Sequence, residues 1–138
     1  MVYTVKVGSM KERKIKINTN QSISFLWAGE NIFSTPSMIS EMEETCRLLL
    51  KEQYLLDVEW DSIGTVVEVK HLAPTPVGAE ILVNGRVSSV NGRRVMFDVE
   101  ANDAREKIGE GRHERFIIHI PSFRNRFIEK QKQLENKL

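Results

Sequence analysis

The sequence has 138 residues and lacks several features that would mark particular classes of protein. Its single cysteine, Cys46, cannot form a disulfide within the chain, which fits a reducing compartment. Twenty basic residues nearly balance nineteen acidic ones, so no general field favours nucleic acid or an anionic membrane. No stretch approaches the roughly 20 apolar residues of a membrane span, and the first residues do not form a targeting signal. We therefore expect a cytoplasmic protein with no membrane or nucleic-acid partner.

Patterns typical of metal and phosphate sites are equally sparse. The three histidines have no spacing typical of metal ligands, so we expect no metal site. Asn91-Gly92 and Gly109-Glu110-Gly111 fit turns or bulges better than a phosphate-binding loop. The length fits a single domain over residues 1–138, with enough chain to bury a hydrophobic core.

The clearest helical pattern lies between residues 36 and 55. Thr35 is suited to cap the first turn of this helix. On a helix starting there, Glu43 falls about 80° from the centre of the apolar stripe, whereas Glu41 and Glu44 point well away. Glu43 is therefore either a carboxylate placed for chemistry or an ordinary acid on the helix flank. The apolar stripe comprises Met38, Ile39, Met42, Cys46, Leu49 and Leu50.

Strand patterns lie on both sides of this helix. One or two strands are expected in residues 2–18, and a long connection over residues 19–34. Alternating patterns predict a meander of four strands at 64–72, 79–90, 93–101 and 106–120, with a hairpin at Asn91-Gly92. A charged surface helix is expected over about 121–138. Because only one long apolar helix can cover the sheet, we expect an α+β fold with a curved antiparallel sheet wrapped around it.

Four motifs occur in order and resemble a known family. They are Thr35-Pro36-Ser37-Met38 with Glu43 eight residues after the threonine, the strand from Gly64 to His71, Pro74-Thr75-Pro76-Val77-Gly78, and Gly111-Arg112-His113-Glu114-Arg115-Phe116. Together they resemble the hotdog-fold thioesterases, and in particular the fluoroacetyl-CoA thioesterase group, over residues 12–122. The resemblance implies a homodimer whose sheets join edge to edge, with acyl-CoA bound at the interface. It also implies a catalytic site of Thr35, Glu43 and His71, with no cofactor beyond the CoA carried by the substrate.

Thioester hydrolysis gives each of these residues a chemical role. The reaction needs a base or nucleophile, a donor for the developing oxyanion and a route for protons. Glu43 can activate water or attack directly, and His71 can hold Glu43 or carry the proton. Backbone N–H groups beside Thr35 can bind the oxyanion at the helix start. Each residue also has a structural alternative: Thr35 can simply cap the helix, and His71 can bond a backbone carbonyl at a strand end.

The spacing of two of these residues predicts how the site is assembled. Thr35 and Glu43 are separated by roughly 12 Å along a helix axis, because each residue adds about 1.5 Å. They are too far apart on one helix to act on the same carbonyl carbon. We therefore predict that a working site combines the helix start of one subunit with the carboxylate of the other.

Other residues and other functions stay open at this stage. Cys46 is expected to be a small core residue and not a nucleophile. Arg93, Arg94 or Arg112 can meet CoA phosphates or simply lie on a solvated sheet face. The alternative function is a non-catalytic acyl-CoA-binding or sensing dimer, while a hydratase is disfavoured because the helix start differs from the hydratase pattern. The sequence names neither the acyl group nor whether its carrier is CoA or an acyl carrier protein.

Overall fold

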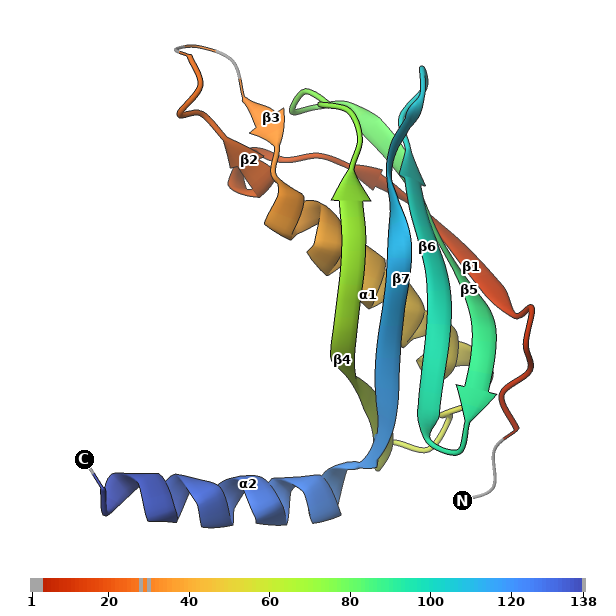
Figure 1. Cartoon of the computed structure of the whole chain (residues 1–138), viewed down its shortest axis with the longest axis vertical. Helices are drawn as coiled ribbons and strands as arrows, with labels where there is room; N and C mark the ends of the chain where they lie inside the picture. Colours follow the sequence, from red (N-terminus) through yellow and green to blue (C-terminus); the bar gives the residue numbers. More distant parts are fainter. Residues whose placement is uncertain (1–3, 28, 30, 138) are drawn as a thin grey trace.

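A five-stranded antiparallel sheet and one long helix form the body of the protein (Figure 1). The computed structural model describes residues 4–27, 29 and 31–137. The strand order is β1-β5-β6-β7-β4. The strands are β1 (Met10–Lys16), β4 (Trp60–His71), β5 (Glu80–Asn91), β6 (Arg94–Asn102) and β7 (Lys107–His119), and the helices are α1 (Thr35–Gln53) and α2 (Ile120–Glu135). The expected α+β hotdog architecture is confirmed.

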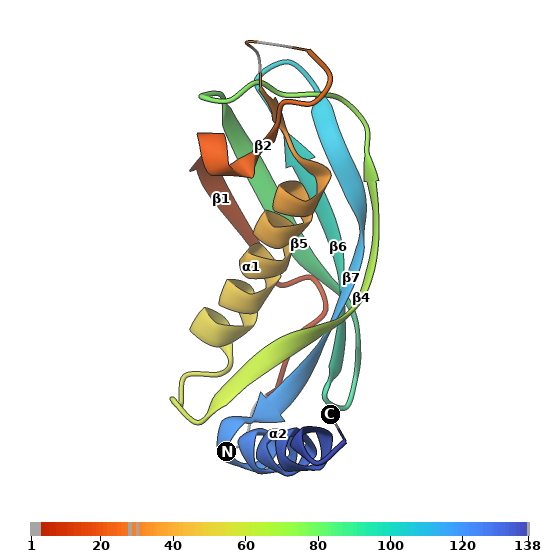
Figure 2. The same cartoon turned by 90° about the vertical axis from the view of Figure 1, so that its left-hand side faces the viewer.

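Helix α1 lies in the concave side of the sheet, which curves around it (Figure 2). Its buried face differs slightly from the predicted one, because Thr45 is buried while Ile39 is only half-buried. This rotation places Glu41 on one flank, where it pairs with Arg13, so the expectation that Glu41 points well away is wrong. The buried residues of α1 are Met38, Met42, Thr45, Cys46, Leu49 and Leu50.

The order of strands in the sheet corrects the predicted meander. Strands β5, β6 and β7 do follow one another, and Gly92 makes the first turn possible with its positive φ of 61°. Strand β4, however, pairs with β7 and not with β5. The long connection from Leu72 to Ala79 carries the chain across the end of the sheet instead of making a tight turn. As a result, β4 is an edge strand.

The segment before α1 contains less strand than the sequence predicts. Of the expected strand region 2–18, residues 2–3 lie outside the described residues, and regular pairing covers only β1. A turn at Gly8, whose φ is 96°, separates β1 from the preceding residues. The connection before α1 contains the 3-10 turn η1 (Thr19–Gln21) and the two short paired strands β2 (Ser22–Ile23) and β3 (Ile32–Phe33).

Strand β4 carries two features that matter for the site. Its pairing with β7 shifts between Gly64 and Val66, which is a bulge. Its outer edge is bordered by largely exposed residues over 64–70, including Val67 at 40% exposure. Within the described residues, no helix is both long and apolar enough to cross a membrane.

Candidate active site

Thr35 and His71 meet where α1 begins and β4 ends. The Thr35 Oγ1 lies 2.7 Å from the His71 Nδ1. The buried Phe33 packs edge-on against the His71 ring, with 6.5 Å between ring centroids. Two of the three predicted site residues are therefore in direct contact within one chain.

The helix cap is Ser34 and not Thr35, which corrects the predicted capping role. The Ser34 side chain accepts a hydrogen bond from the Ser37 N–H at 3.1 Å, and Thr35 is the first helical residue. Pro36 has no N–H, and the Met38 N–H donates to the Ser34 carbonyl at 3.0 Å. Among the described residues, the Thr35 N–H of this first turn has no hydrogen-bond partner. That Thr35 contributes to an oxyanion site stays a prediction.

The other nitrogen of His71 is unsatisfied. Its Nε2 is buried and has no hydrogen-bond partner among the described residues. Burial lowers the pKa of His71 from its ordinary value, although the nearby Ala73 backbone partly opposes this. Because a buried unsatisfied nitrogen is costly, the Nε2 is poised to bond a substrate, a water molecule or a residue of another chain.

A groove opens beside this pair. It has a volume of ≈ 330 Å³ and is lined by Thr35, His71 and apolar residues that include Leu26 and Leu72. A second hollow of ≈ 510 Å³ lies between the Trp27 region and the loop at Pro74. The Thr35–His71 pair therefore borders space that a small acyl group can occupy.

Glu43 lies elsewhere, two turns further along α1, facing the bulge of β4. A Cβ built on Gly64 would be only 3.2 Å from the Glu43 Oε1 and 3.0 Å from the His113 Cε1. Gly64 thus leaves the room that the carboxylate occupies. No hydrogen bond joins Glu43 to Thr35 or His71 within the described chain, so the structure does not bring all three predicted residues together in one protomer.

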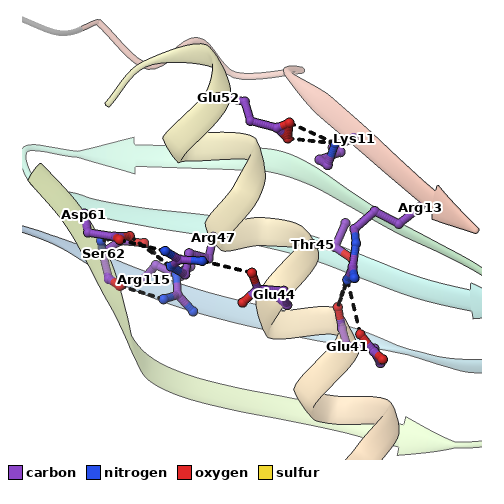
Figure 3. A network of polar contacts seen from close by, with 10 residues as sticks. All are labelled: Lys11, Arg13, Glu41, Glu44, Thr45, Arg47, Glu52, Asp61, Ser62 and Arg115. Carbon is purple, nitrogen blue, oxygen red and sulfur yellow. Dashed lines mark hydrogen bonds and ion pairs between the residues drawn. The ribbon is translucent and has the colours of Figure 1, made fainter. Parts of the chain in front are cut away.

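Arg115 and His113 lie near Glu43, although neither is among the predicted site residues. Both are buried, at 5% and 1% exposure, and they project from β7 toward α1. The Arg115 Nε donates to the Ser62 Oγ at 2.7 Å and its Nη2 to the Ser62 carbonyl at 2.7 Å (Figure 3). Its third nitrogen, Nη1, lies 3.1 Å from the His113 Nε2. Arg115 is therefore a fixed positive charge under the helix.

The contacts of His113 determine its tautomer. Its Nδ1 lies 2.8 Å from the Val66 carbonyl, which can only accept, so the Nδ1 carries the proton. The Nε2 then accepts from Arg115. Burial is the main cause that lowers the pKa of His113, and the nearby Arg115 charge lowers it further. His113 is thus neutral, and it borders the space at Gly64 together with Arg115 and the Glu43 carboxylate.

Two patterns in the sequence could have revealed this cluster. His113, Arg115 and Ile117 alternate along one strand, so they share the face that a buried isoleucine identifies as inward. A glycine at position 64 on the neighbouring strand leaves the space for large polar side chains.

Ion pairs line both flanks of α1 and hold it in register with the sheet (Figure 3). Arg47 bonds Asp61 at the start of β4, with 2.9 Å between the Nη2 and Oδ2 atoms, and it also pairs with Glu44. On the opposite flank, Arg13 of β1 contacts the Glu41 carboxylate at 3.2 Å. These ion pairs connect α1 to the strands on both sides of it.

Cys46 is unsuited to chemistry. It is fully buried beside Gly85, where an added Cβ would come within 2.9 Å of its sulfur. Burial raises the pKa of the Cys46 thiol to about 12, so the reactive thiolate is not formed near neutral pH. No group of three or more potential metal ligands occurs in the part of the chain that the structure describes.

Comparisons with known proteins agree with this geometry. A sequence model described as fluoroacetyl-CoA-specific thioesterase matches residues 17–120. The chain belongs to this family. The fluoroacetyl-CoA thioesterase of Streptantibioticus cattleyicolor is 39% identical over 92 residues, which are 67% of this chain and 65% of that relative. The chain therefore spans slightly less than two thirds of the curated relative that it matches.

Solved structures extend the family resemblance to the whole fold. A structure of a fluoroacetyl-CoA thioesterase superposes with a TM-score of 0.82 and 28% identity, covering 92% of this chain and 98% of that one. A variant of that enzyme in complex with fluoroacetate and CoA gives a TM-score of 0.77 at 29% identity, over 86% and 99% of the two chains. A thioesterase superfamily member from Thermus thermophilus, 24% identical, shares the fold with a TM-score of 0.84 over 96% and 98% of the two chains.

Proposed function

We propose that the chain is a thioester hydrolase that cleaves a small or medium acyl-CoA at a site shared by two subunits. The observation that carries this proposal is the Thr35–His71 contact of 2.7 Å, with the second nitrogen of His71 buried and unsatisfied. The family match supports the reaction class, and the adjacent groove supports a small acyl group. No cofactor enters the proposal, because CoA is part of the substrate.

The exposed edge of β4 supports a homodimer. The unpaired backbone N–H and C=O groups of an edge strand can pair with a strand of another chain, and β4 is such an edge strand. The exposed residues 64–70 are centred on Val67, so antiparallel pairing about Val67 would bring Gly64 of one chain beside Lys70 of the other. Glu43, which faces Gly64, would then approach His71 of the partner. This arrangement supports the prediction that one subunit supplies Thr35 and His71 and the other supplies Glu43.

The proposed reaction uses these groups as follows. The Thr35 hydroxyl and N–H donate to the thioester carbonyl oxygen, and the Glu43 carboxylate of the second subunit removes a proton from a water molecule. The water oxygen bonds to the carbonyl carbon, the carbon–sulfur bond breaks, and the thiolate of CoA receives the proton from Glu43 directly or through His71. The products are the free acid and CoA. Direct attack by Glu43 on the carbonyl carbon is the alternative route.

The test combines a substrate panel with subunit mixing. The protein is incubated with short and medium acyl-CoAs and acyl carrier protein thioesters, and a thiol reagent reports release. Turnover that disappears in Glu43→Ala with the fold intact supports hydrolysis, whereas tight CoA binding without thiol release would favour an acyl-CoA-binding dimer. Light scattering measures the dimer itself.

Subunit mixing distinguishes a shared site from one built within a single chain. His71→Ala and Glu43→Ala are each expected to be inactive alone. In a random mixture, a shared site regains about a quarter of the wild-type rate, because half of the dimers are mixed and one of their two sites is complete. A mixture that stays inactive while mixed dimers form would contradict the shared site.

A further inference from the structure

Helix α2 is mostly exposed in the single chain. None of its residues from Ile120 to Glu135 is buried. Four apolar side chains nevertheless share one stripe at helical spacing, and two of them, Phe127 and Leu134, are 59% and 51% exposed. An exposed stripe of this kind marks a surface that packs against something else. The stripe consists of Ile120, Phe123, Phe127 and Leu134.

The direction of α2 is set by contacts at its base. The Ile120 N–H donates to the Glu59 carbonyl at 2.7 Å, and the His119 Nε2 lies 3.2 Å from the Glu59 carboxylate. The His119 Nδ1 is 2.8 Å from the Ser122 Oγ, and its ring packs on Trp60 with 5.0 Å between centroids. These contacts join the end of β7 to the start of β4, so α2 leaves the sheet at a defined angle.

That angle carries α2 beyond the sheet. In Figure 1 the helix runs from the end of β7 past the β4 edge, and the C-terminus lies well outside that edge. In Figure 2, which looks at the edge, α2 is seen nearly end-on. Because His119 pairs with Trp60, the helix departs from the Trp60 end of β4.

Symmetry then determines what α2 meets. If β4 pairs antiparallel with its copy, the Trp60 end of one strand lies beside the His71 end of the other. We propose that α2 of each subunit lies across the His71 end of its partner, so that a second copy of this chain covers each Thr35–His71 groove. This inference rests on the proposed edge-to-edge dimer and adds a partner-supplied wall to its active site.

The surface around His71 has the character that such a helix needs. Leu72, next to His71, is 48% exposed, and Leu26 on the same groove is 55% exposed. If Phe127 and its neighbours packed on this surface, the apolar stripe of α2 and the apolar residues of the groove would both be removed from water. The groove at His71 would then have a floor from its own chain and a cover from the partner.

Cross-linking in full-length mixed dimers tests the inference. Two differently tagged chains are co-expressed, one with Phe127→Cys and the other with Leu72→Cys, and purified through both tags. A short bis-maleimide is expected to join them into a covalent dimer. The native Cys46 gives little background, because it is buried and its pKa is raised to about 12. The matched control replaces Leu72→Cys by Met10→Cys, which is 53% exposed on the opposite edge strand β1.

The possible results separate this inference from the proposed function. Rapid cross-linking of Phe127→Cys with Leu72→Cys, and slow or no cross-linking with Met10→Cys, supports the inference whether or not the protein hydrolyses a thioester. If light scattering shows a dimer but cross-linking is not selective, the proposed position of α2 is wrong, whereas the proposed dimer is not contradicted. A protein that is monomeric by light scattering overturns both.

Discussion

The two ends of the exposed stretch of β4 differ in how completely the chain satisfies its own polar groups. At the Gly64 end, Arg115 bonds Ser62 twice and His113 once, and His113 bonds the Val66 carbonyl. At the His71 end, the ring has Thr35 on one nitrogen and nothing among the described residues on the other. We call the Gly64 end the finished end, because its buried polar side chains are hydrogen-bonded within one chain, and the His71 end the unfinished end, because the His71 Nε2 is not.

This difference indicates which half of the proposed site is rigid and which is completed on assembly. Leaving a buried donor or acceptor unsatisfied costs about 1–3 kcal/mol, so a fold keeps such a group only where something else binds it. Antiparallel pairing of β4 brings a finished end beside an unfinished one. A catalytic carboxylate on a rigid support would thereby meet a histidine with a free nitrogen.

The largest expected effect comes from removing the charge at the finished end. Glu43→Gln is expected to lower kcat about 10²- to 10⁴-fold, the range for a lost general base, with KM little changed. Steady-state kinetics with a thiol reagent measure both constants. Glu44→Gln is the matched control, because Glu44 is the adjacent acid and pairs with Arg47 on the helix flank. Equal losses in the two variants would show that Glu43 acts only through the structure.

The next effect separates catalysis from helix capping at the unfinished end. Thr35→Ala is expected to lower kcat about 10²-fold, as loss of an oxyanion donor does, while the melting temperature hardly changes. Ser34→Ala should do the reverse, costing about 1 kcal/mol of stability because the true cap is lost, with a smaller change in kcat. Thermal melting and kinetics on both variants check this. A large stability loss in Thr35→Ala would return that residue to a structural role.

The parts predictable from sequence are those with a strong periodic signal. The spacing of Met42, Cys46 and Leu49 was enough to predict α1, and a single apolar helix was enough to predict a sheet that wraps around it. The partner of β4 was not predictable, because the long loop after Leu72 fits more than one path. The capping residue was missed because Ser34 and Thr35 are adjacent and equally suited, and only the backbone conformation distinguishes them.

The buried cluster at Glu43 shows a different limit. Arg115 looks like one of several charges on an alternating strand, and its burial depends on the space at Gly64 and on the Ser62 acceptors of the neighbouring strand β4. Hydrogen bonds between residues that are far apart in the sequence leave no local sequence pattern. Thr35 and His71 are predicted from motifs of the family, and the structure places their side chains 2.7 Å apart, while their catalytic role stays a prediction.

A smaller change at the finished end tests how tightly the carboxylate is held. Gly64→Ala places a methyl group 3.2 Å from the Glu43 Oε1 and 3.0 Å from the His113 Cε1, so both must shift by a few tenths of an ångström. We expect kcat to fall about tenfold through misplacement of the carboxylate, with KM less affected. Kinetics and light scattering on the same sample separate this from loss of the dimer. An unchanged kcat would mean that the Glu43 carboxylate can shift by this amount without loss of activity.

The smallest effect compares the two histidines of β4 and β7 through pH. Burial lowers the pKa of both His71 and His113, so the folded protein resists protonation where an unfolded histidine, with a pKa near 6.5, accepts it. The unfolded state therefore binds more protons below about pH 6.5, and stability present above that pH is lost as the pH falls toward the folded pKa values. Urea unfolding at fixed protein concentration, from about pH 8 to about pH 5, should show this loss of stability.

The two histidines should contribute unequally to this pH dependence. His113→Asn should remove more of it than His71→Asn, because His113 is 1% exposed and hydrogen-bonded to Arg115, while His71 lies in an open groove. The reverse order would mean that the His71 end is the better protected of the two, and that assembly already closes it.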